Sequence, residues 1–384
     1  MKLLGLLLVF AGTSVINLPS GVRQNNDQFN RNTASQKVQV AILLDVSGSM
    51  EGLIEQAKAQ LWNMVTTLGK AKCDNNQQPP QIEIALYEYG RTDADGKTGY
   101  VKQLSGFTTD LDKLSATLFS LTTDGGDEYC GQVIKTSLEE LNWDPAPGNY
   151  KVIFIAGNED FLQGGTPYTQ ACAIAKQKGV IVNTIYCGDR AQGIAEHWKL
   201  NNECGTGSFT NINQEERTED IETPYDSALY VLNEKLNATY IGYGYSGAAN
   251  KARQEAMDKA NAAVSRRALM QRNEAKVMRG VYDNSGWDLV DAYSADSTVL
   301  SRVDTSTLPD SLKGKSKQAL QIVVIRKTTE RNNIRQELTD LHALRNNYIN
   351  DEKRRRGTNG ASTLETEMEK LLRIQAREFG IVVE

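Results

Sequence analysis

Short apolar runs alternate with helix-like stretches from residue 38 to residue 212, and this alternation restricts the possible folds more than any other feature. Residues 38–44 are mostly apolar at both odd and even positions, as in a strand covered on both faces of a parallel sheet. Residues 52–68 follow with apolar side chains at helical spacing. Alternating strands and helices predict an α/β fold with a doubly wound, mostly parallel sheet. The further strands expected are 82–87, 100–104, 152–155, 180–186 and 207–212, and the further helices are 110–120, 131–141, 168–178 and 192–200.

One pair of strands departs from this alternation. Residues 82–87 and 100–104 are joined by a turn-rich stretch, 90–99, in place of a helix. Antiparallel strands need only a short connection, whereas parallel strands need a crossover of a dozen or more residues. We therefore expect one antiparallel edge strand in the sheet.

The last third of the chain has a different, helical texture. Helices are expected over residues 247–281, 315–356 and 362–378. An apolar stripe in the second helix has steps of 4, 3, 3 and 4, which suits a helical hairpin or a short coiled coil. It comprises Ile334, Leu338, Leu341, Leu344 and Tyr348. The stripe favours an internal core, and a homo-oligomer formed through this helical region is the alternative.

The first twenty residues indicate the compartment. Met1 and Lys2 precede thirteen nearly all-apolar residues, 3–15, which is the pattern of a secretory signal peptide. A thirteen-residue helix rises about 20 Å, short of the roughly 30 Å hydrocarbon core of a bilayer. An uncleaved anchor is the alternative, but no later run could span a membrane. The prediction is a secreted, periplasmic or cell-envelope protein with a signal peptide at 1–20, a flexible polar leader at 21–36, an α/β domain at 37–237 and a helical region at 238–384.

Composition excludes several classes of function. The chain has 43 Lys and Arg against 48 Asp and Glu, a net charge of −5, with 40% hydrophobic residues. Such a chain can build a core, which argues against complete disorder. Nucleic acid is excluded as the main partner because phosphate binding needs an excess of clustered cations. The only two histidines, His197 and His342, lie too far apart in sequence for a His-x-x-x-His zinc helix.

A cluster of oxygen-bearing side chains follows the first strand. Asp45, Ser47 and Ser49 alternate along a predicted strand-to-helix loop. Ligands of an open α/β sheet bind at this edge. Hard oxygen donors with few formal charges suit Mg²⁺, or another hard divalent ion, with several waters retained. The alternative is that these side chains only cap the helix that follows.

Residues 42–50 read Ile-Leu-Leu-Asp-Val-Ser-Gly-Ser-Met and resemble the opening of a von Willebrand factor type A (VWA) domain. The resemblance covers about residues 37–215 and implies a Rossmann-like fold with a metal ion-dependent adhesion site (MIDAS). It implies that Ser47 and Ser49 bind Mg²⁺, Mn²⁺ or Ca²⁺ directly and that Asp45 binds directly or through water.

Two further MIDAS positions differ from the family pattern. Asp127 stands after Gly125-Gly126, where the family has Thr, and is predicted to bind the metal. Ala156 replaces the aspartate that follows the central strand in the family. Glu159 or Asp160 would then have to reach the ion, and we select Asp160. Relative to the family pattern, the negative charge added by Asp127 would compensate for the aspartate that Ala156 replaces.

Five cysteines in an oxidising compartment tend to pair, and an odd number leaves one over. A helix followed by an antiparallel strand brings Cys172 and Cys187 to the same sheet edge, so a disulfide is expected there. Cys130 and Cys204 form a second candidate pair, with Cys73 left over. Buried free thiols are the alternative.

Together these features predict a non-enzymatic binding or adhesion protein that engages a protein or cell-surface ligand through its metal-site loops. One alternative is a structural envelope component that assembles through its helical region without metal. Another is a metal-dependent hydrolase. A Cys/His nucleophile would need His197 beside a cysteine such as Cys204, and the sequence offers no third residue to orient them.

Overall fold

The computed structural model describes residues 36–383 except 94–95, 201–203, 217–218 and 358–362. The predicted signal peptide lies outside the described residues, as does the predicted leader up to residue 35. In the part that is described, no helix is long and apolar enough to cross a membrane.

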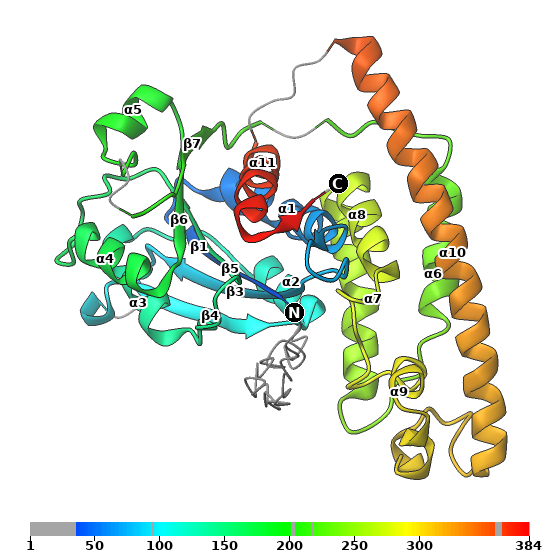
Figure 1. Ribbon diagram of the computed structural model, residues 1–384. Helices are drawn as coiled ribbons and strands as arrows, with labels where there is room; N and C mark the ends of the chain where they lie inside the picture. The colour runs from blue at the N-terminus through cyan, green and yellow to red at the C-terminus, as the bar shows by residue number, and fades with distance from the viewer. Residues whose placement is uncertain (1–35, 94–95, 201–203, 217–218, 358–362, 384) are drawn as a thin grey trace, which may run out of the picture. The chain divides into compact units, whose positions relative to one another are not determined.

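A six-stranded sheet forms the centre of the α/β part (Figure 1). Its strand order is β4-β3-β1-β5-β6-β7, and β4 is the one strand that pairs antiparallel to its neighbour, β3. The predicted doubly wound, mostly parallel sheet with one antiparallel edge strand is therefore confirmed. The strands are β1 (Lys37–Asp45), β3 (Gln81–Tyr89), β4 (Val101–Thr108), β5 (Tyr150–Gly157), β6 (Ile181–Cys187) and β7 (Phe209–Ile212).

The two faces of the sheet bury two different cores. In β1, Val40 and Ile42 pack into one core, and Ala41 and Leu43 pack into the other. This alternation follows from the period of two along a strand. The first core receives α1 (Glu51–Gly69) and α2 (Leu111–Phe119), and the second receives α3 (Cys130–Glu140) and α4 (Tyr168–Lys178). Both faces are covered, as the apolar strands require.

Two predicted helices differ from the observed ones. The stretch 247–281 contains two helices, α7 (Gly247–Val264) and α8 (Arg266–Val277), and not one. Ser265 is extended, with φ −165° and ψ 156°, and its hydroxyl accepts a hydrogen bond from the Ala268 amide, so it caps α8. The helix expected at 192–200 is α5 (Arg190–Ala195), which ends five residues early.

The remaining C-terminal elements pack on one another and on the α/β part. They are α6 (Asp226–Asn237), α9 (Leu289–Ala295), the long α10 (Lys317–Arg356), α11 (Leu364–Ala376) and the short strand β8 (Ile381–Val382). In the apolar stripe of α10, Ile334 and Leu338 are buried in the first core of the sheet, whereas Leu344 is 47% exposed. Association of two copies through this helix stays a prediction.

The end of the chain returns to the sheet. Strand β8 pairs antiparallel with β2 (Lys72–Cys73), which follows α1. Gln375 of α11 accepts a hydrogen bond from the Tyr150 hydroxyl at 2.9 Å and exchanges hydrogen bonds with Asn183 of β6. Contacts therefore cross the predicted boundary at residue 237, from the last helix to the central strands.

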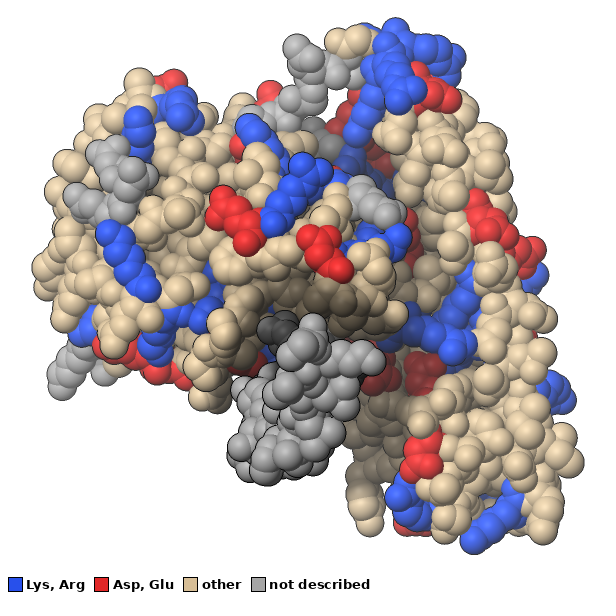
Figure 2. All heavy atoms as spheres, viewed as in Figure 1, with Lys and Arg blue, Asp and Glu red and all other residues tan. Residues whose placement is uncertain are grey.

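Basic side chains gather at the end of α10 (Figure 2). Lys353 to Arg356 occupy the last turn, where cations interact favourably with the negative end of the helix dipole. Arg355 and Arg356 form ion pairs with Glu352, and Arg356 also pairs with Glu219. The charges of this basic run are thus partly balanced within the chain.

The disulfide pairing differs from the prediction. Cys172 pairs with Cys204, while Cys73, Cys130 and Cys187 are buried free thiols. Both expected pairs, Cys172–Cys187 and Cys130–Cys204, are therefore wrong in this structure. The chain after α5 comes back beside α4 before it enters β7, which brings Cys204 within a Cα separation of 4.2 Å from Cys172. Cys187 instead lies in the first core, on the other face of the sheet from Cys172.

Candidate metal site at the end of the first strand

The candidate site lies at the carboxyl end of β1, in the centre of the sheet. Strand β1 ends at Asp45 and α1 begins at Glu51, so Ser47 and Ser49 lie on the connecting loop. Strand β3 ends at Tyr89, which pairs with Asp45 in register. Strand β5 ends at Gly157, one residue after Ala156, which pairs with Leu44. This is the edge at which open α/β sheets bind their ligands.

Asp45 is fully buried at this edge. Its Oδ1 accepts a hydrogen bond from the Ser47 amide at 2.8 Å. Its Oδ2 is also buried and has no hydrogen-bond partner among the described residues. A Cβ at Gly90 would lie 3.0 Å from Oδ1, and one at Gly157 would lie 2.9 Å from Oδ2. The two glycines thus leave room for this carboxylate, whose second oxygen lacks a protein partner.

The two serines lie side by side next to Asp45. Their Oγ atoms are 3.4 Å apart, and the Asn158 side-chain amide donates to Ser49 Oγ at 3.2 Å. The N-cap position of α1 is occupied by Met50. None of the three predicted ligands stands there. No side chain in the described part of the chain caps this helix. The capping alternative therefore does not account for Asp45, Ser47 and Ser49.

Two glutamates, Glu128 and Glu159, add carboxyl groups near Asp45. Burial, together with smaller contributions from the nearby charges of Asp45 and Glu159, raises the pKa of Glu128 to about 8. Burial also raises the pKa of Asp45 to about 6; the hydrogen bonds from Ser47 oppose this shift, and the charge of Glu159 adds a smaller contribution in the same direction as burial. Carboxylates this close resist simultaneous ionisation unless a cation is present.

Asp127 and Asp160, the other predicted ligands, have their own partners. Asp127 is exposed, and its Oδ2 accepts a hydrogen bond from the Tyr129 hydroxyl at 3.2 Å. Asp160 has a 46% exposed side chain whose Oδ1 lies 3.0 Å from His197 Nδ1. Their binding to a metal stays a prediction.

Glu128 was not among the predicted ligands, although it directly follows Asp127. In the structure Glu128 is buried near Asp45, and a Cβ at Gly90 would lie 3.0 Å from both Glu128 Cγ and Asp45 Oδ1. The sequence signal for this residue was its place in the Gly125–Glu128 loop. The two adjacent acids differ in the direction of their side chains, since Glu128 is buried and Asp127 is exposed.

Comparison with known proteins gives structural similarity alone. No family model matches the sequence, and no curated protein matches it. Three similar solved structures are proximal thread matrix protein 1 from the mussel byssus with a zinc-occupied MIDAS motif (12% identity, TM-score 0.32), a von Willebrand factor type A protein from Catenulispora acidiphila (17%, 0.35) and the pilus adhesin SpaC from Lactobacillus rhamnosus GG (15%, 0.33). The similarity covers 46%, 47% and 46% of this chain and 42%, 39% and 28% of theirs, so it spans less than half of each protein.

Strand order and motif position together decide the fold type. The central strand β1 carries Asp45 at its carboxyl end, and Ser47 and Ser49 follow on the loop into α1. Residues 37–212 have a VWA-type fold. Within this VWA part, the site just described lies where the sequence resemblance predicts a MIDAS, and we refer to this place as the MIDAS position.

The residues at the MIDAS position fit a hard cation that keeps water ligands. Within the described ranges, no three His, Cys, Asp or Glu side chains are grouped so that they could hold a metal ion. A metal would therefore depend on the unpartnered Oδ2 of Asp45 and the hydroxyls of Ser47 and Ser49, with water completing the shell. Mg²⁺ commonly binds in this way, through one or two carboxylates and several waters.

Proposed function

We propose that this chain is a binding protein whose VWA part engages a protein or cell-surface ligand through a divalent metal ion. Asp45, Ser47 and Ser49 would hold the ion, and Mg²⁺, Mn²⁺ and Ca²⁺ are the candidates. The observation that supports this most directly is the Oδ2 atom of Asp45, buried without a partner among the described residues. Leaving a buried polar atom unsatisfied costs roughly 1–3 kcal/mol, which a bound ion or an ordered water would offset.

The chain's own residues prepare this position. The Ser47 amide fixes Asp45 Oδ1 so that Oδ2 is left for the ion. Asn158 orients the Ser49 hydroxyl through its side-chain amide. Glu159 adds negative charge that favours a cation, and a bound cation would in turn favour the ionised form of Glu128. A divalent ion supplies an electrophilic position for an oxygen of the partner.

The loops around the site would select the partner. Asp127 and Asp160 are exposed on the loops that follow α2 and β5, so both can contact a ligand that approaches the metal. In this proposal the protein is exported and acts outside the cytoplasm, in the envelope or beyond. The Cys172–Cys204 disulfide is compatible with such an oxidising location.

We propose a non-catalytic role because the candidate nucleophile is committed elsewhere. Cys204, the cysteine considered with His197, forms a disulfide with Cys172. His197 faces Asp160 with a 48% exposed side chain. A metal-dependent hydrolase is the alternative, and turnover of a model ester or peptide that is abolished by Asp127→Ala would support it.

Thermal unfolding in the presence of metal ions tests the proposal. The purified chain is melted in chelator and then in millimolar Mg²⁺, Mn²⁺ or Ca²⁺, beside Asp45→Ala and a control, Asp340→Ala on the exposed face of α10. An ion at 100 times its Kd stabilises the folded state by about 2.7 kcal/mol. The midpoint should rise for the wild type and the control but not for Asp45→Ala. Equal shifts in all three proteins, or none in any, would count against a metal site at Asp45.

A further inference from the structure

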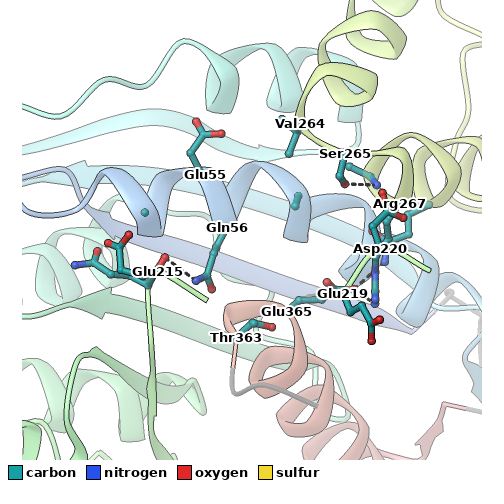
Figure 3. Close-up of a pocket in the computed structure, with 15 residues that line it drawn as sticks. Glu55, Gln56, Glu215, Glu219, Asp220, Val264, Ser265, Arg267, Thr363 and Glu365 are labelled. Carbon is teal, nitrogen blue, oxygen red and sulfur yellow. Dashed lines mark hydrogen bonds and ion pairs between the residues drawn. The ribbon is translucent and has the colours of Figure 1, made fainter. Parts of the chain in front are cut away.

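A cavity of about 490 Å³ shares no lining residue with the Asp45, Ser47 and Ser49 site and lies between the VWA part and the C-terminal helices (Figure 3). Four segments that are distant in sequence line it: α1, the loop after β7, the junction of α7 with α8, and the start of α11. Its volume falls within the range of small-molecule sites, about 300–1,000 Å³.

Hydrogen bonds from one glutamine hold three of these segments together. The Gln56 side-chain amide of α1 donates to the carbonyls of Asn213, Gln214 and Glu216 at 2.9, 3.0 and 2.7 Å. Its Oε1 accepts from the Leu364 amide at the start of α11, at 2.8 Å. The cavity is therefore formed before a ligand arrives, which lowers the ordering cost of binding.

Carboxylates dominate the charge of the cavity. Glu55, Glu215, Glu219, Asp220 and Glu365 line it, and Arg267 is the one cation among the lining residues that the structure describes. The side chains come from several walls, as the labelled sticks in Figure 3 show.

Three of these carboxylates are neutralised within the chain. Glu365 pairs with Arg267, Glu219 pairs with Arg356, and Glu55 pairs with Lys58 at 2.8 Å. Glu215 and Asp220 have no cationic partner among the residues that the structure describes. Two negative charges therefore remain available at the edge of a cavity whose surface also includes the partly exposed apolar side chains of Ala59 and Val264.

The arrangement of these carboxylates favours an elongated cation over a compact one. Across the described ranges, no three acidic side chains converge closely enough to hold a metal ion. A linear polyamine carries its charges on ammonium groups spaced along methylene segments. Each ammonium is a donor of three hydrogen bonds, and the methylenes gain from contact with apolar surface.

We propose that this cavity binds a linear aliphatic polyamine. The ammonium groups are held by Glu215 and Asp220, and the methylene segments lie against Ala59 and Val264. Because the ligand would touch both the VWA part and the helices, its binding would also hold these two regions together. The inference does not depend on metal binding at Asp45.

Calorimetric titration of the full chain with spermidine, in buffer that contains millimolar Mg²⁺, tests this proposal. The double variant Glu215→Gln/Asp220→Asn should weaken binding at least tenfold. A matched double variant on exposed helix faces, Glu139→Gln/Asp340→Asn, should leave the Kd within a factor of two. Equal weakening in both variants would show charge screening alone and overturn the proposal, as would no binding to the wild type.

Two further variants keep the test specific. Ala59→Lys places an alkylammonium group of the chain itself in the cavity and should abolish spermidine binding without removing a carboxylate. Asp45→Ala should bind spermidine as the wild type does, and loss of binding there would assign the polyamine to the MIDAS position. Circular dichroism and the thermal midpoint of each variant confirm that it is folded.

Discussion

Arg272 of α8 donates a hydrogen bond to Asp112 of α2 at 2.6 Å, and both side chains are buried. The contact joins the predicted C-terminal helical region to the VWA part across 160 residues of sequence. Arg272 also donates to Asp258 of α7 at 2.6 Å and lies over the Trp62 ring of α1 at 4.5 Å. One guanidinium thus links helices from both parts of the chain.

Asp258 is held ionised by its cationic partners. Burial favours the protonated form of Asp258, but Lys276 and Arg272 outweigh it and hold the pKa of Asp258 well below its usual range. Asp112 also accepts a hydrogen bond from the Tyr282 hydroxyl at 2.6 Å. The network is fully inside the protein, where an ion pair that loses one partner leaves an uncompensated charge.

We predict that Arg272→Ala lowers the free energy of unfolding by roughly 3–5 kcal/mol, because Asp112 and Asp258 lose their shared cation. Urea unfolding followed by circular dichroism measures the change. Arg326→Ala, at an exposed position of α10, is the control and should change stability by about 0.5 kcal/mol at most. A comparable loss in the two variants would mean that the buried network does not hold the parts together.

The pH dependence of stability should carry a signature of His342. Burial lowers the pKa of His342 to about 4; Glu274 opposes this shift, whereas Arg345 and Lys70 add to it. Between pH 6.5 and 4 the unfolded chain binds a proton that the folded chain excludes, so this residue makes stability fall as the pH falls. At pH 5 the loss relative to pH 7 is roughly 2 kcal/mol.

Urea unfolding of wild type and His342→Gln at pH 7 and pH 5 isolates this effect, because the contributions of other groups cancel in the difference. The variant should lose roughly 2 kcal/mol less stability on acidification than the wild type. His197→Gln, at an exposed position, should follow the wild type. Identical pH dependence in wild type and His342→Gln would contradict the account.

The disulfide gives a third prediction. Cys172 and Cys204 are 32 residues apart, and closing a loop of that size stabilises a protein by roughly 4 kcal/mol in the chain-entropy model. Cys172→Ser and Cys204→Ser should each lower the free energy of unfolding by about this amount under oxidising conditions. Peptide mapping without reductant should recover one cross-linked pair, and a peptide linking Cys172 to Cys187 would contradict the structure.

The sheet could be predicted from sequence because each strand is a local signal. Apolar runs with both odd and even positions filled require cover on both faces, and the short turn-rich link after residue 89 requires an antiparallel neighbour. The Asp45 loop could be placed for the same reason, since a strand-to-helix connection at the central strand leads to one sheet edge. The break at Ser265 could not be predicted, because its neighbours all favour helix and packing decides the bend.

Long-range placement accounts for the remaining differences. Cys204 reaches Cys172 only because the chain after α5 comes back beside α4, which no spacing in the sequence reveals. Glu128 and Asp127 are adjacent and chemically alike, so the sequence could not show that Glu128 is the buried one. Side-chain direction in an irregular loop is set by tertiary contacts such as the close approach to Gly90.

Titration with Mn²⁺, followed by the loss of the free-ion electron paramagnetic resonance signal, tests the central claim most directly. Wild type should bind one Mn²⁺ that Mg²⁺ displaces, because Asp45 Oδ2, Ser47 and Ser49 form a single hard-donor site. Asp45→Asn keeps the shape of the side chain and should lose this ion, while Asp340→Asn should retain it. Binding of one Mn²⁺ with equal affinity by wild type and Asp45→Asn would contradict a metal site at the end of β1.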